Sequence, residues 1–190
     1  MLPIPSLSQY ARLCPWPGGK QLVAEVFAPM HPPLPWQRRP ARTGEILLAG
    51  RLALEGRFLE DPLLAPALAD FEDFQDSLGL GADKPVCCQL IPDAKMVDEE
   101  HRISVLRNKV KIEVYGSEGV RRALVWLEEE MLKRGGPFLP LVTHHRKPVI
   151  RTRISRCFFG PINRPPANRD ELADEVDYYP EPYLNRLAHE

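Results

Sequence analysis

Apolar and polar residues alternate most regularly in the middle of the chain, over residues 108–115. The apolar positions there are interleaved with charged ones: Val110, Ile112 and Val114 against Lys109, Lys111 and Glu113. A period of two residues predicts a strand with one buried face. After a turn at residues 116–119, apolar residues return at helical spacing as far as Met131, so we expect an amphipathic helix. Gly135-Gly136-Pro137 should end that helix.

Further patterns predict three more strands and one more helix. Residues 45–54 and 85–91 are short apolar runs bounded by glycine or proline, which is typical of buried strands. Gly50 marks an expected bulge in the first of them. Between the two runs, Asp61-Pro62 should begin a helix whose apolar positions are Leu64, Leu68, Phe71 and Leu78. Residues 148–156 alternate again and put arginines on one face of a strand.

Proline divides the chain into a compact centre and two arms. Of the 21 prolines, nine fall in residues 1–40, eight in residues 137–190 and four in between. Proline fixes φ and pushes its predecessor toward extended backbone, so we expect extended arms with one strand at residues 22–27 and one short helix at residues 169–176. The predicted organisation is an extended proline-rich arm (1–43), an α+β domain of one small sheet packed by about two helices (44–160), and an acidic extended C-terminal tail (161–190).

Bulk composition excludes several classes of protein. The four cysteines, two of them adjacent, form no framework of the disulfide-rich secreted kind. No apolar run approaches the roughly 20 residues that span a bilayer, so we expect an intracellular protein with no membrane span. The first 24 residues lack acidic side chains, as a mitochondrial transit peptide does, but their prolines disfavour the amphipathic helix of such a peptide. A mitochondrial protein without a cleaved presequence fits both observations.

Charge is segregated along the chain although the net charge is only −1. Residues 131–169 hold nine Lys and Arg and no acidic residue, whereas the chain from Asp170 onward holds seven acidic residues against Arg186. We expect the basic stretch to contact RNA phosphates through a flexible loop at residues 144–147 and the strand that follows. The residues predicted for this contact are Arg146, Lys147, Arg151, Arg153 and Arg156. The same side chains would serve equally to pair with the acidic tail or with an acidic partner protein.

The sequence contains no recognisable motif for catalysis or cofactor binding. Pro17-Gly18-Gly19-Lys20 lacks the first glycine and the hydroxyl residue of a phosphate loop, and Gly79-Leu80-Gly81 lacks the third glycine of a dinucleotide site. The acidic run at residues 70–76 is typical of the solvent-facing side of a helix. The adjacent pairs Cys87-Cys88 and His144-His145 do not have the spacing of zinc ligands. We therefore predict no catalytic residues, no metal site, no cofactor and no small-molecule substrate.

One stretch resembles known RNA-binding families. KVKIEVYGSEGVRRALVWLEEEML, residues 109–132, resembles the closing strand and helix of a KH domain. Residues 109–155 are similar to the opening half of an S10-type ribosomal protein, in which a proline-rich loop, a basic tip and a strand follow the helix. A KH domain grips nucleic acid through a GXXG loop between two helices, and the upstream sequence SLGLGADKP contains none. No functional residue is therefore transferred from either family.

These observations together favour a non-catalytic structural subunit of a large assembly. A ribonucleoprotein similar to a ribosome accounts best for the basic stretch, with RNA and neighbouring protein subunits as partners. The first alternative is a structural subunit of a protein-only complex, of the respiratory, viral or secretion kind, in which the basic face meets an acidic protein surface. The second alternative is a small enzyme whose site residues come together only in the fold.

Overall fold

The computed structural model describes residues 19–150 and 181–189, and the chain divides into two compact units. One unit combines residues 1–30 with residues 152–190, and its described part holds two helices, α2 (Gly19–Val26) and α5 (Glu181–His189). Arg186 of α5 donates hydrogen bonds to the carbonyl oxygens of Val26 (3.1 Å) and Ala28 (2.9 Å). A guanidinium at the end of α2 thus satisfies carbonyls that the helix leaves unpaired.

The other unit, residues 31–151, is built on a five-stranded sheet in the order β2-β3-β5-β4-β7. Its strands are β2 (Leu52–Gly56), β3 (Val86–Pro92), β4 (His101–Val105), β5 (Lys109–Val114) and β7 (Thr143–Arg146). The pairs β2–β3 and β3–β5 are parallel, whereas β4 runs antiparallel to both β5 and β7. A sheet with both parallel and antiparallel strands, accompanied by helices, confirms the predicted α+β class. A second sheet of two strands, β1 (Glu45–Leu47) and β6 (Phe138–Pro140), accompanies the first.

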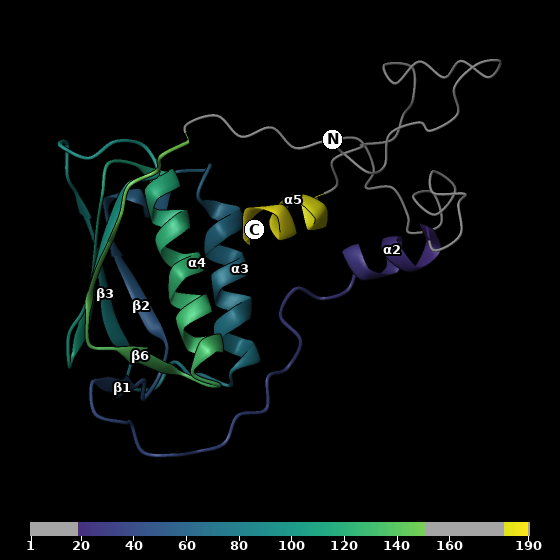
Figure 1. Cartoon of the computed structure of the whole chain (residues 1–190), viewed down its shortest axis with the longest axis horizontal. Coiled ribbons are helices and arrows are strands. Elements are labelled where there is room, and N and C mark those ends of the chain that lie inside the picture. Colours follow the sequence, from purple (N-terminus) through teal and green to yellow (C-terminus); the bar gives the residue numbers. More distant parts are fainter. Residues whose placement is uncertain (1–18, 151–180, 190) are drawn as a thin grey trace. The chain divides into compact units, whose positions relative to one another are not determined.

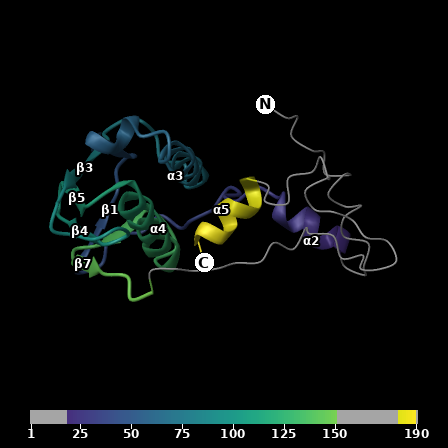
Figure 2. The same ribbon diagram turned by 90° about the horizontal axis from the view of Figure 1, so that it is seen from above.

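Two helices, α3 (Ala65–Ser77) and α4 (Ser117–Lys133), cover one face of the five-stranded sheet (Figures 1 and 2). A short 3₁₀ helix, Arg57–Glu60, leads from β2 toward α3. Phe71 and Phe74 of α3 and Leu127 of α4 are fully buried in one hydrophobic cluster with the inward-facing residues of β5. Each such side chain contributes about 1.5–3 kcal/mol by leaving water, so this helix-covered face is where the unit obtains its stability.

The strand and the helix predicted in the middle of the chain are confirmed residue by residue. The strand expected at residues 108–115 is β5, where Val110, Ile112 and Val114 are buried and the charged residues between them are half-buried. The expected helix is α4, and it ends where the glycines begin, because Gly135 adopts a φ of +66° that only glycine takes readily. The amide of Gly136 donates to the carbonyl of Met131 at 3.1 Å and closes the helix end.

The single strand predicted at residues 45–54 was wrong, because this segment forms β1 and β2, which belong to different sheets. Gly50 lies between the two strands, and the loop that follows α3 passes directly over it. A Cβ atom at Gly50 would lie 2.2 Å from the carbonyl oxygen of Asp83. Close backbone approach of another loop, rather than a bulge within one strand, is therefore the reason for glycine here.

Three predictions outside the core also need correction. Residues 22–27 were expected to form a strand but lie largely in α2, where Val23 and Val26, three residues apart, are buried as on one face of a helix. Residues 144–147 were expected to be a flexible loop, but residues 144–146 belong to β7. Residues 148–150 are not in a strand, and the rest of the strand predicted to Arg156 and the helix predicted at 169–176 lie outside the described residues.

Within the described ranges, no helix has the length and apolar character needed to cross a bilayer.

Candidate functional site: a hollow beside β7

Two of the five predicted RNA-contact residues are described, and they lie at the end of β7. Arg146 is the last residue of this strand and pairs with His101 of β4, while Lys147 follows it. Both side chains are exposed. Arg151, Arg153 and Arg156 lie outside the described residues.

Arg146 borders a shallow hollow of about 470 Å³ between the C-terminal half of α4 and the segment that carries β6 and β7. The hollow is also lined by Trp126 and Lys133 of α4, by Arg134 directly after this helix, and by His144 of β7. Lys133 and Arg134 come from the start of the acid-free stretch, and Arg146 comes from its middle. The fold thus gathers residues that are 12 or more positions apart in the sequence, although α4 adds Glu129 and Glu130 to the same lining.

The acidic residues of α4 neutralise two of the three strong cations. Lys133 Nζ lies 2.8 Å from Glu129 and 3.4 Å from Glu130, and its hydrogen bond to Glu129 raises the pKa of the ammonium group. Arg134 forms an ion pair with Glu130 one helical turn earlier. Arg146 forms no ion pair with any other described residue. The hollow therefore has one cation that is available to an external anion.

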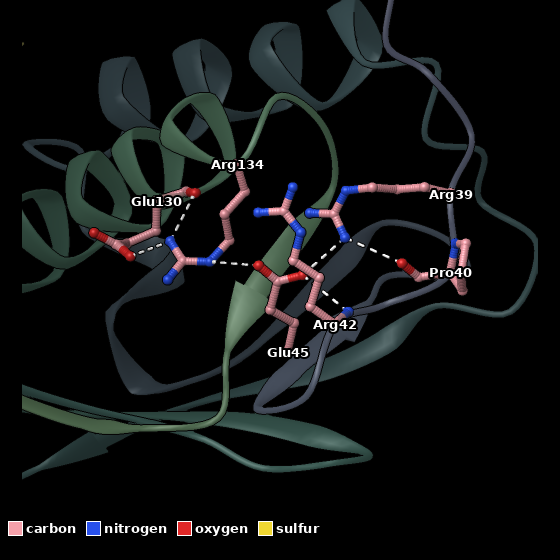
Figure 3. Close-up of polar contacts among 6 residues, drawn as sticks. All are labelled: Arg39, Pro40, Arg42, Glu45, Glu130 and Arg134. Atoms are coloured by element: carbon pink, nitrogen blue, oxygen red, sulfur yellow. Dashed lines mark hydrogen bonds and ion pairs between the residues drawn. The ribbon is translucent and has the colours of Figure 1, made fainter.

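Glu45 holds Arg134 from the opposite side and connects α4 to the segment before β1 (Figure 3). Its carboxylate accepts hydrogen bonds from Arg39 Nη1 (2.9 Å) and from the backbone amide of Arg42 (3.1 Å), and its other oxygen lies 3.5 Å from Arg134 Nε. The Arg39 hydrogen bond keeps the pKa of Glu45 below its ordinary value. Arg39 also stacks 3.6 Å above the Phe138 ring. These contacts fix the position of Arg134 at one side of the hollow.

Trp126 and two histidines form an aromatic stack beside the hollow. Trp126 and His144 are stacked with ring centroids 4.7 Å apart, and His101 lies 5.9 Å from His144. Burial lowers the pKa of both imidazoles. His101 Nδ1 must donate its proton to the Glu99 carbonyl oxygen at 2.9 Å, because a carbonyl only accepts. The Nε2 atoms of both histidines are buried without a hydrogen-bond partner among the described residues.

Lys147 differs from Arg146 because a buried carboxylate neutralises it. Glu100 is 6% exposed, and its two oxygens lie 2.9 Å from His145 Nε2 and 3.6 Å from Lys147 Nζ. A hydrogen bond from the Val97 amide is the main reason that the pKa of Glu100 is lowered. The sequence could not reveal this pairing, because Glu100 precedes Lys147 by 47 residues.

The adjacent cysteines have no activated thiol. Burial raises the pKa of Cys88, and burial together with the neighbouring Glu55 carboxylate raises that of Cys87. Both groups are therefore thiols at neutral pH, whereas a nucleophilic cysteine needs its thiolate. Their positions on β3 are explained by packing and by the sheet register.

Comparisons with known proteins add little to this geometry. No family model matches the chain, and no curated protein matches it. One solved structure with detectable similarity is that of a β-N-acetylhexosaminidase from Bacteroides fragilis, at 18% sequence identity and a TM-score of 0.40. The alignment covers 60% of this chain and 23% of that chain. A likeness this distant supports no functional assignment.

Proposed function

We propose that this chain is a non-catalytic component of a larger ribonucleoprotein, and that Arg146 contacts an RNA phosphate at the hollow beside β7. The observation that carries this proposal is the exposed guanidinium of Arg146, which has no ionic partner among the described residues. A guanidinium presents paired N–H donors that match two phosphate oxygens. Arg151, Arg153 and Arg156 follow within ten residues of sequence and would extend the contact along the backbone.

The aromatic stack adds a second feature that suits a nucleic acid. Trp126 is half-buried and lines the hollow together with Arg146, so an aromatic side chain and an exposed guanidinium lie in one depression. Base stacking on aromatic side chains and phosphate pairing with arginine are the two usual contributions to single-stranded RNA binding. Neutral His144 adds a polar group without further charge.

A protein-only assembly is the second candidate, and the other ion pairs favour it. Residues 31–150 hold 17 Lys and Arg against 18 Asp and Glu, and Lys133, Arg134 and Lys147 all pair with carboxylates of the same unit. A unit with no net surplus of cations suits an acidic protein patch as well as it suits a polyanion. Its partner would then meet Arg146 through a carboxylate.

The experiment is an RNA-binding titration of the wild type and Arg146→Ala over a range of salt concentrations. Loss of one charge-assisted hydrogen bond of about 1.5–3 kcal/mol should weaken binding by about ten- to a hundredfold. The slope of log K against log salt should fall by roughly 0.7 for a single-stranded RNA. Arg57→Ala is the matched control, because Arg57 is also exposed and does not line the hollow.

Two outcomes would overturn the RNA contact. The first is an Arg146→Ala protein whose affinity and salt slope equal those of the wild type and of Arg57→Ala. The second is retention of the protein in its native particle after complete nuclease digestion, which would instead favour the protein-only assembly.

A further inference from the structure

Three side chains with metal-binding chemistry meet where helices α3 and α4 contact each other. His31 comes from the segment before β1, Asp70 from α3 and Glu128 from α4. One ligand atom from each lies within 4.8 Å of the others, and His31 Nε2 is 3.2 Å from Asp70 Oδ1. We propose that these three residues bind a divalent metal ion, with Zn²⁺ the best fit.

Two backbone-anchored contacts hold His31 at this place. The amide of Leu34 donates to the carbonyl of Ser77 at 2.8 Å, and the Trp36 indole donates to the carbonyl of Leu78 at 2.9 Å. The segment therefore runs along the C-terminal half of α3. The His31 ring also packs edge-on against Phe74, with centroids 5.3 Å apart. These contacts restrict the imidazole before any ion binds, which reduces the entropic cost of coordination.

Burial and charge favour a cation at this position. The Glu128 residue is 2% exposed, and the side chains of His31 and Asp70 are 8% and 12% exposed. Two carboxylates so close together and so little hydrated repel each other. A dication would compensate both charges at once.

The donor set and spacing suit zinc better than calcium or magnesium. One imidazole nitrogen and two carboxylate oxygens are ordinary zinc ligands at about 2.0–2.1 Å, whereas Ca²⁺ and Mg²⁺ prefer oxygen alone. Two ligands on a tetrahedral ion with such bonds stand roughly 3.3 Å apart. The 3.2 Å between His31 Nε2 and Asp70 Oδ1 already has this value, and a carboxylate oxygen of Glu128 lies within 4.8 Å of both atoms.

A bound ion would connect the segment before β1 to both covering helices. His31 is separated from Asp70 by 39 residues and from Glu128 by 97, so coordination would join three distant parts of the unit. We therefore expect zinc binding to stabilise the folded unit, since a ligand that binds only the native state shifts unfolding to higher temperature.

The test is a calorimetric titration of Zn²⁺ into the full chain, purified without a polyhistidine tag and stripped of metal with a chelator. We expect saturable binding of one ion and a higher Tm with zinc, and at least tenfold weaker binding of Mg²⁺. Asp70→Asn and Glu128→Gln keep the side-chain shape and should weaken zinc binding at least tenfold, as should His31→Ala. Glu72→Gln and His145→Ala are matched controls, because both residues are exposed and lie outside the cluster.

The proposal is overturned if zinc binding is absent or does not saturate. It is equally overturned if Asp70→Asn and Glu128→Gln, shown by circular dichroism to be folded, bind zinc like the wild type. Should His31→Ala fail to fold, these two conservative variants decide the question by themselves. RNA binding plays no part in this measurement, so its outcome is independent of the function proposed above.

Discussion

Arg146 and Lys147 are adjacent cations in the sequence, yet their surroundings give them different chemistry. Glu100, the residue just before β4, neutralises Lys147, and the sequence pattern did not predict that strand, whereas Arg146 lines a hollow with no ionic partner among the described residues. A run of basic residues thus indicates where cations gather but does not indicate which of them are available. For this reason the RNA-binding experiment substitutes Arg146 and not Lys147.

The buried histidines give a prediction about pH. Burial lowers the pKa of His101 and His144, so as pH falls the unfolded chain takes up protons near pH 6.5, before the folded one does. Stability should therefore decrease as pH falls from about 7.5 to about 5.5. Urea unfolding at these pH values measures it. The His101→Gln/His144→Gln double variant should show a smaller decrease.

An equal loss of stability in the double variant and the wild type would show that His101 and His144 do not cause the pH dependence. The pH window matters, because the carboxyl groups with lowered pKa, such as Glu45 and Glu100, lose their contribution only as pH falls further, from about 4.5 downward. The histidine effect and the acid effect are therefore separable in one set of curves.

At the scale of elements, a later loop approaches the backbone of the segment between β1 and β2 closely. A Cβ atom at Gly50 would lie 2.2 Å from Asp83 O and 2.8 Å from Lys84 O, both backbone atoms. Gly50→Ala must displace this loop, and such overpacking costs about 1–3 kcal/mol. Urea denaturation should show that loss of unfolding free energy.

Gly81→Ala is the matched control in the same loop. Its added Cβ would meet nothing closer than the Asp83 amide nitrogen at 3.9 Å, so we expect a change within about 0.5 kcal/mol. Equal stabilities for the two alanine variants would show that the loop yields easily and that the close approach at Gly50 does not constrain the fold.

At the scale of the whole molecule, the main hydrophobic cluster of the described residues belongs to one unit. The hydrophobic cluster and the residues packed on it all lie between Leu34 and Leu141, within the unit of residues 31–151. We therefore expect a fragment of residues 31–150 to fold without the rest of the chain. Circular dichroism should show helix and strand, and thermal unfolding should be one cooperative transition. A fragment that lacks a transition would show that its core needs the remaining segments.

The local sequence pattern was sufficient to predict β5 and α4, because the buried positions of β5 repeat with the period of a strand and those of α4 with the period of a helix. It was sufficient for the C-terminal ends of α3 and α4 as well, since Gly79 and Gly135 supply the positive φ that stops a helix. The start of α3 at Asp61-Pro62 was predicted wrongly, because the helix begins at Ala65. The α+β class follows from these signals. The segment 22–27 was misread because an apolar run that short fits a strand or a helix equally well.

Only the tertiary structure decided which side chains meet. The backbone that approaches Gly50 between β1 and β2 belongs to a loop more than 30 residues later, and the neutralisation of Lys147 depends on Glu100. The cluster of His31, Asp70 and Glu128 has no sequence signature at all, because its members lie on three segments that packing alone brings together. Periodicity is a property of neighbours along the chain, whereas a binding site is a property of neighbours in space.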